Sequence, residues 1–206
     1  MTNHERRARQ VASLARRLAE AAAVELARLD LMHSNRFVRE ELLYPLMAIA
    51  PSAERWQPSA EASFAERKIG SSARKGDVRR ADLKFWRLDD RDTSPLEVIV
   101  EIKLYKSDLP RRAKTLHAVL ARIQRRHTKA AIAAANIKRQ RYVIGVVVAR
   151  LSTSVARRAP EPKIDTHNHN ALPELLAEST VHGEFGTLAR AYLLFDNSKP
   201  GRSIAK

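Results

Sequence analysis

The run YVIGVVVARL, residues 142–151, narrows the choice of folds more than any other feature of this chain. It has the length of a β-strand, and no charged residue occurs before Arg150. A strand that is apolar on both faces is typical of the centre of a sheet that is covered on both sides. We therefore expect the chain to build a sheet around this segment.

The segments on either side of this strand alternate between helical and strand patterns. Apolar residues three and four apart predict helices, in the second of which Leu42 and Ile49 are among the expected core positions. Clusters of proline and small or polar residues predict loops and turns. In chain order we expect helices at about 10–31 and 35–48, a loop at 50–63, strands at about 64–69, 78–88 and 96–105, a helix at 109–135, the strand at 142–151, a polar loop at 152–170, a short helix in LPELLAES (172–179) and a last strand in AYLLFDN (191–197).

This order of elements predicts an α/β chain of the α+β kind. The expected core is a mixed sheet in an α-β-β-β-α-β arrangement, with an extra helix at the amino terminus. We divide the chain into a basic amphipathic helix at 1–34, a core at 35–150, and a segment at 151–206. The last segment, with its loop, short helix and final strand, is expected to complete the same domain.

The charge of the chain is strongly unbalanced. Lys and Arg number 38 against 23 Asp and Glu, giving a formal net charge of +15. Such an excess favours a polyanionic partner, with nucleic acid ahead of an anionic membrane surface. The chain has no cysteine, which excludes disulfides and thiolate zinc sites. Without a secretory signal or an apolar run of roughly 20 residues, we expect a cytoplasmic protein with no membrane partner.

Two charged residues interrupt the apolar run VIVEIKLY, residues 98–105. Because side chains alternate along a strand, Glu101 and Lys103 share one face while the valines and Ile102 pack on the core. The turn-forming stretch DDRDTSP (89–95) divides this strand from the preceding one. A hairpin folded between residues 91 and 92 places Asp82 next to Glu101.

Two neighbouring carboxylates repel each other unless a cation lies between them or one takes up a proton. A hard divalent cation such as Mg²⁺ resolves this conflict, and Lys103 can offset the remaining charge. Such a cation can activate water and stabilise the charge that grows on phosphate oxygens. Together with the positive net charge, this predicts phosphodiester hydrolysis on a nucleic acid.

The same residues resemble a known family. ADLKFW (81–86) and EVIVEIKLY (97–105) are similar to the PD-(D/E)XK nuclease superfamily, with its restriction-endonuclease-like fold. The resemblance implies an endonuclease that acts on DNA, with Asp82 and Glu101 binding Mg²⁺, for which Mn²⁺ can substitute. It implies that Lys103 assists attack on the phosphate. Ala81 stands where the family's name-giving proline would be.

Further residues are expected to belong to the site. Many members of the family add a Glu from the helix before the sheet; Glu40 is the preferred candidate here, and Glu41 is the alternative. Nicking both strands of a duplex needs two sites, which is compatible with a homodimer. The residues expected to contact DNA are Arg74, Lys75, Arg79, Arg80, Lys84, Arg111 and Arg112.

Other readings of these residues stay open. Glu101 and Lys103 could form cross-strand ion pairs on a solvent-exposed sheet face. The chain could be a basic nucleic-acid-binding module with the same fold and no catalysis, which metal dependence would distinguish from an enzyme. An anionic lipid surface is a weaker alternative, because the basic residues are spread over many elements. In IDTHNHN, His167 and His169 could bind a metal or nucleic acid.

Overall fold

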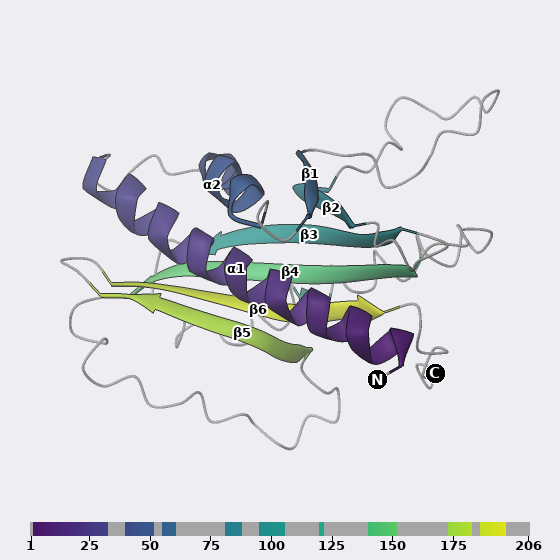
Figure 1. Cartoon of the computed structure of the whole chain (residues 1–206). Coiled ribbons are helices and arrows are strands. Elements are labelled where there is room, and N and C mark those ends of the chain that lie inside the picture. Colours follow the sequence, from purple (N-terminus) through teal and green to yellow (C-terminus); the bar gives the residue numbers. More distant parts are fainter. Residues whose placement is uncertain are drawn as a thin grey trace, which may run out of the picture.

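A mixed sheet with a long helix across one face makes up most of the described part of the structure (Figure 1). The computed structural model describes residues 2–32, 40–51, 55–60, 81–87, 95–105, 120–121, 140–151, 173–182 and 186–196. Within them the six strands follow the order β1-β2-β3-β4-β6-β5. The strands are β1 (Gln57–Ala60), β2 (Leu83–Arg87), β3 (Leu96–Tyr105), β4 (Gln140–Leu151), β5 (Glu174–Val181) and β6 (Gly186–Asp196).

The predicted α+β class and mixed sheet are confirmed. Strands β3 and β4 are parallel, and the other neighbouring pairs are antiparallel. The bounds of β3 are those predicted, and β4 is an inner strand between β3 and β6. Residues 142–149 of β4 are all buried, as the apolar run required.

The long helix α1 (Asn3–Met32) begins at a capping box formed by Thr2 and Glu5. The Thr2 backbone N–H donates to the Glu5 carboxylate at 2.8 Å, and the Glu5 backbone N–H donates to the Thr2 hydroxyl at 3.2 Å. The two side chains thus satisfy backbone donors at the helix start. The predicted apolar stripe is buried along its whole length: Val11, Leu14, Ala15, Leu18, Ala22, Leu26 and Leu29.

Helix α1 lies diagonally across one face of the sheet, in contact with β4, β5 and β6 (Figure 1). Its stripe packs against one side of the strands, represented by Val98 and Ile144, to form the main core. On the opposite face, Ile99 and Val143 pack with Leu120 in a second cluster. Leu120 is helical and belongs to the segment predicted as a long helix, so β4 is covered on both faces.

The loop predicted for residues 50–63 is wrong in part, because Gln57–Ala60 forms strand β1. β1 pairs antiparallel with β2 at the edge of the sheet. Pro58 has no backbone N–H to donate. An edge strand tolerates this residue, because such a strand has a neighbouring strand on one side only. Trp56, just before β1, is 2% exposed and meets Phe85 edge to face.

The short helix predicted in LPELLAES is also wrong, because Glu174–Val181 is strand β5. Leu, Ala and Glu favour a helix locally, but β5 pairs with β6 along its length and packs against α1. Tertiary pairing therefore overrides the local preference. The predicted last strand is confirmed and begins earlier, at Gly186.

Within the predicted helix at 35–48, residues 40–48 are described: they form a 3₁₀ turn, η1 (Glu40–Leu43), and most of a short α-helix, α2 (Tyr44–Ile49). Leu42 and Ile49 are 42% and 65% exposed, so their predicted core positions are wrong. Leu43 and Met47 are buried instead. The tighter 3₁₀ turn rotates the following residues relative to an uninterrupted α-helix, which changes the buried face.

Several predicted elements fall on residues outside the described ranges. These are the strand at 64–69, the loop at 152–170 with its two histidines, and the helix at 109–135 apart from residues 120–121. Among the helices that are described, none combines the length and apolar character needed to cross a membrane.

Candidate active site

The start of β2 and the second half of β3 bring two acidic residues together. The ladder pairs Leu83 with Val100, so the next position on each strand sets Asp82 opposite Glu101. This is the register predicted by a turn centred between residues 91 and 92. Asp82 lies in the bend just before β2, and Glu101 lies within β3.

The Asp82 carboxyl group is held from two elements. Its Oδ2 accepts a 2.7 Å hydrogen bond from the Ile102 backbone N–H, and the Tyr44 hydroxyl on α2 also hydrogen-bonds to it. Burial raises the pKa of Asp82 above its ordinary value of 3.8, and the charge of Glu101 adds to the rise. The two hydrogen bonds and the charge of Lys103 oppose that rise. Two carboxyl groups and an ammonium therefore interact at this end of the hairpin.

Glu101 lies beside an apolar surface. It is 4% exposed, and its neighbour on β4 is Gly145. A Cβ atom on Gly145 would lie 2.8 Å from Leu194 Cδ1 and 3.3 Å from Leu120 Cδ2, so glycine allows both leucines to pack close to the sheet. The alternative of solvent-exposed ion pairs therefore does not hold for Glu101. A charge in such surroundings is costly unless a cation or a hydrogen bond offsets it.

The paired carboxyl groups suit a hard divalent cation. Mg²⁺ is commonly held by one or two carboxylates and keeps several water ligands. No group of three or more Asp, Glu, His or Cys side chains that could hold a metal occurs among the described residues. Asp82 and Glu101 supply two such side chains, opposite each other across the β2–β3 pair. A cation between them would offset the repulsion that contributes to the raised pKa of Asp82.

The other predicted site residues are placed only in part. Glu40 and Glu41 begin η1, which contacts β3, but their side chains lie outside the described part. The predicted DNA contacts other than Lys84 also fall on residues that the structure does not describe: Arg74, Lys75, Arg79, Arg80, Arg111 and Arg112.

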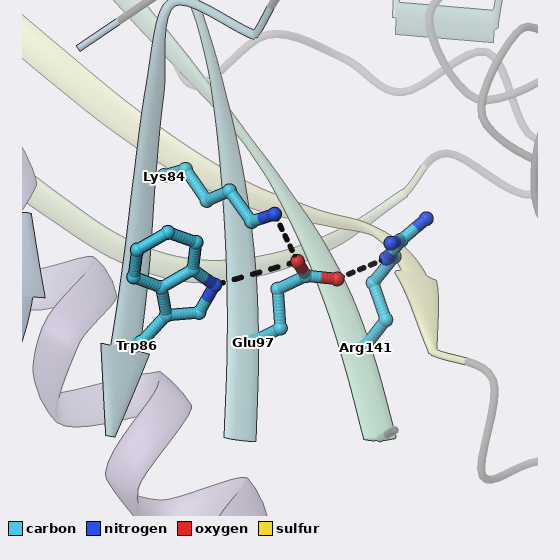
Figure 2. Close-up of polar contacts among 4 residues, drawn as sticks. All are labelled: Lys84, Trp86, Glu97 and Arg141. Carbon is cyan, nitrogen blue, oxygen red and sulfur yellow. Dashed lines mark hydrogen bonds and ion pairs between the residues drawn. The ribbon is translucent and has the colours of Figure 1, made fainter. Parts of the chain in front are cut away.

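A second charged cluster, which the sequence interpretation missed, lies four residues before Glu101 on the same strand (Figure 2). Glu97 is 1% exposed and forms ion pairs with Lys84 of β2 and Arg141 of β4. The Trp86 indole N–H donates a 3.4 Å hydrogen bond to Glu97, and the Lys84 ammonium lies 4.7 Å from the Trp86 ring centre. This Glu97 cluster joins three adjacent strands.

The Glu97 cluster changes the expected role of Lys84. Lys84 is 7% exposed, and its ammonium is engaged by Glu97 inside the protein. A lysine in this position balances a buried carboxylate and is poorly exposed to a phosphate backbone. We therefore leave Lys84 out of the proposed DNA contacts.

The pKa of Glu97 gives a testable acid dependence. Burial alone would raise it, but the hydrogen bond from Lys84 and the charges of Arg141 and Lys84 lower it below its ordinary value of 4.5. An acid whose pKa is lower in the folded state stabilises the fold above its unfolded pKa. That contribution disappears as the pH falls from about 4.5 through the folded pKa.

We expect the free energy of unfolding of wild type to exceed that of Glu97→Gln most at neutral pH. The difference should shrink as the pH falls below about 4.5. Urea unfolding of both proteins from pH 7 to pH 3 measures this difference in free energy. Asp82 is present in both proteins, so its own titration largely cancels from the difference. A difference that stays constant over that range would contradict a lowered pKa for Glu97.

Comparison of the chain with protein-family models, curated proteins and solved structures finds no match.

Proposed function

We propose that this chain is a Mg²⁺-dependent endonuclease of the PD-(D/E)XK type that hydrolyses phosphodiester bonds in DNA. The observation that carries the proposal is that Asp82 and Glu101 lie opposite each other across the β2–β3 pair. Lys103 lies close enough for its charge to act on the Asp82 carboxyl group. The two carboxylates suit a divalent cation, and the ammonium beside them suits a phosphate oxygen.

The order of the strands supports the same proposal. β1, β2 and β3 are antiparallel neighbours, and β4 then runs parallel to β3. The connection from β3 to β4 includes the helical residues 120–121. The resemblance implies three antiparallel strands, a helix and a further strand, and this order supports it with β1 (57–60) as the first strand in place of the one predicted at 64–69.

The groups of the site would divide the work between them. Bound by Asp82 and Glu101, Mg²⁺ would activate water and stabilise the charge that develops on the phosphate oxygens. The Ile102 N–H keeps the Asp82 carboxyl group against β3. Lys103, which is partly exposed, would contact a phosphate oxygen or orient the attacking water.

The net charge of +15 supports a polyanionic substrate, because contacts to phosphates supply most of the sequence-independent affinity for DNA. We also propose a cytoplasmic location. A homodimer would provide the two sites needed to cut both strands of a duplex.

Lys103→Ala tests the proposal in a plasmid assay. Wild type should nick supercoiled plasmid in Mg²⁺ or Mn²⁺, and a chelator should stop the reaction. Lys103→Ala should lower the rate by about 100-fold or more, since it removes a charge that acts on the reacting phosphate. Its affinity for DNA in chelator should fall by less than about tenfold, because one contact among many carries a small share.

A matched control is Arg9→Ala, which removes one positive charge from the exposed side of α1. It should cleave at close to the wild-type rate. DNA binding by wild type without cleavage under either metal would instead favour the non-catalytic nucleic-acid-binding module. Cleavage that persists in chelator would contradict the metal-dependent nuclease.

A further inference from the structure

Where the β2–β3 ladder ends, the Asp82 carboxyl group takes the place of a backbone carbonyl as the acceptor of a β3 hydrogen bond. Regular pairing stops at Leu83 and Val100, and Asp82 lies in the bend before β2. Its Oδ2 accepts the Ile102 N–H, a donor between Glu101 and Lys103 along β3. The carboxyl group is thus tied to the strand segment that carries the other two site residues.

Tyr44 approaches the same carboxyl group from a separate element. It is the first residue of α2, and its hydroxyl hydrogen-bonds to Asp82. Two neighbours fix the backbone of this turn, because Leu43 and Met47 are completely buried in the main core. Tyr44 itself is partly buried against that core. The hydroxyl is therefore presented by an anchored turn rather than by a long exposed side chain.

We propose that Tyr44 is a positioning residue for the nuclease site, an inference that rests on the proposed function. Its hydroxyl and the Ile102 N–H hold the Asp82 carboxyl group in one orientation beside Glu101. Groups that hydrogen-bond to a metal-binding carboxylate orient it, and their loss typically weakens metal binding 10–100-fold. Tyr44 also links the turn that begins at Glu40 to the hairpin.

Tyr44→Phe removes the hydroxyl and keeps the ring. Calorimetric titration of the full chain with Mn²⁺ should give a Kd about 10–100 times that of wild type. In the plasmid assay the cleavage rate should be low at limiting Mn²⁺ and should recover at high Mn²⁺, with KM for DNA unchanged. A residue that only stabilises the fold would lower the Tm of the metal-free protein and leave the Kd of the folded protein for Mn²⁺ unchanged.

Tyr142→Phe is a matched control, because it too removes a hydrogen-bonded tyrosine hydroxyl, here on a fully buried side chain that accepts a 2.7 Å hydrogen bond from Gln140. Tyr142 pairs with Val98 near the start of β3, away from Glu101, so its Mn²⁺ affinity should equal that of wild type. In Tyr44→Phe/Asp82→Asn the loss should be no greater than in Asp82→Asn alone, because the hydroxyl acts through Asp82.

The outcomes separate the two proposals. No Mn²⁺ binding and no cleavage by wild type would overturn the proposed function, and the role of Tyr44 with it. Wild-type binding together with an unchanged Kd in Tyr44→Phe would overturn only the role of Tyr44. A weakened Kd in Tyr142→Phe equal to that in Tyr44→Phe would also overturn it, because the loss would then follow from general loosening of the fold.

Discussion

Asp82→Asn is expected to lower plasmid cleavage at least about 100-fold, which corresponds to about 2.7 kcal/mol of transition-state stabilisation. The amide keeps an oxygen that can accept the Ile102 N–H and has nearly the shape of the carboxylate, so the hairpin should still form. What it loses is the negative charge that would bind the cation with Glu101. Single-turnover cleavage rates in Mg²⁺ and in Mn²⁺ measure the effect.

Glu178→Gln is the control for Asp82→Asn. Glu178 lies on β5, where it pairs with Arg190 at the surface and has a side chain 42% exposed. Neutralising it should leave the cleavage rate within about twofold, because β5 lies at the edge of the sheet away from β2 and β3. An exposed ion pair also contributes little to the stability of the fold. If Asp82→Asn cleaves as fast as Glu178→Gln, Asp82 does not belong to the reacting site.

Glu97→Gln is expected to lower the free energy of unfolding by about 3 kcal/mol. The substitution leaves Lys84 and Arg141 buried without the charge that now balances them. For a chain of this size it should lower Tm by roughly 6–12 °C. Thermal and urea unfolding with circular dichroism measure both quantities.

The composition of the Glu97 cluster also predicts an order of effects. Lys84→Met should cost less than Glu97→Gln, because Glu97 would still be paired with Arg141. The exposed pair between Glu178 and Arg190 gives the comparison, and Glu178→Gln should cost less than about 1 kcal/mol. Equal costs for Glu97→Gln and Glu178→Gln would show that the Glu97 cluster does not stabilise the sheet.

The elements that the sequence predicted well carry strong local patterns. The stripe of α1, the alternation along β3 and the apolar run in β4 each fix a period or a burial state without reference to distant residues. β1 and β5 lack such patterns. β1 is a four-residue edge strand with a proline, and β5 consists largely of helix-favouring residues that become a strand by pairing with β6.

The contrast between local patterns and long-range pairing also explains which contacts between charged residues could be predicted from the sequence. Asp82 and Glu101 are joined by a hairpin, so the position of the turn gives their register. Glu97 and Arg141 lie on parallel strands joined by a long crossover, and no local turn sets which residues meet. Tyr44 meets Asp82 because of the way α2 packs in the fold. The sequence pattern of neither segment predicts this contact.

The position of a bound cation tests the central claim most directly. In crystals grown with Mn²⁺, an anomalous difference map should show a peak about 2.0–2.4 Å from carboxylate oxygens of both Asp82 and Glu101. A map without a peak at these oxygens would contradict the proposed site, as would carboxyl groups on opposite faces of the sheet.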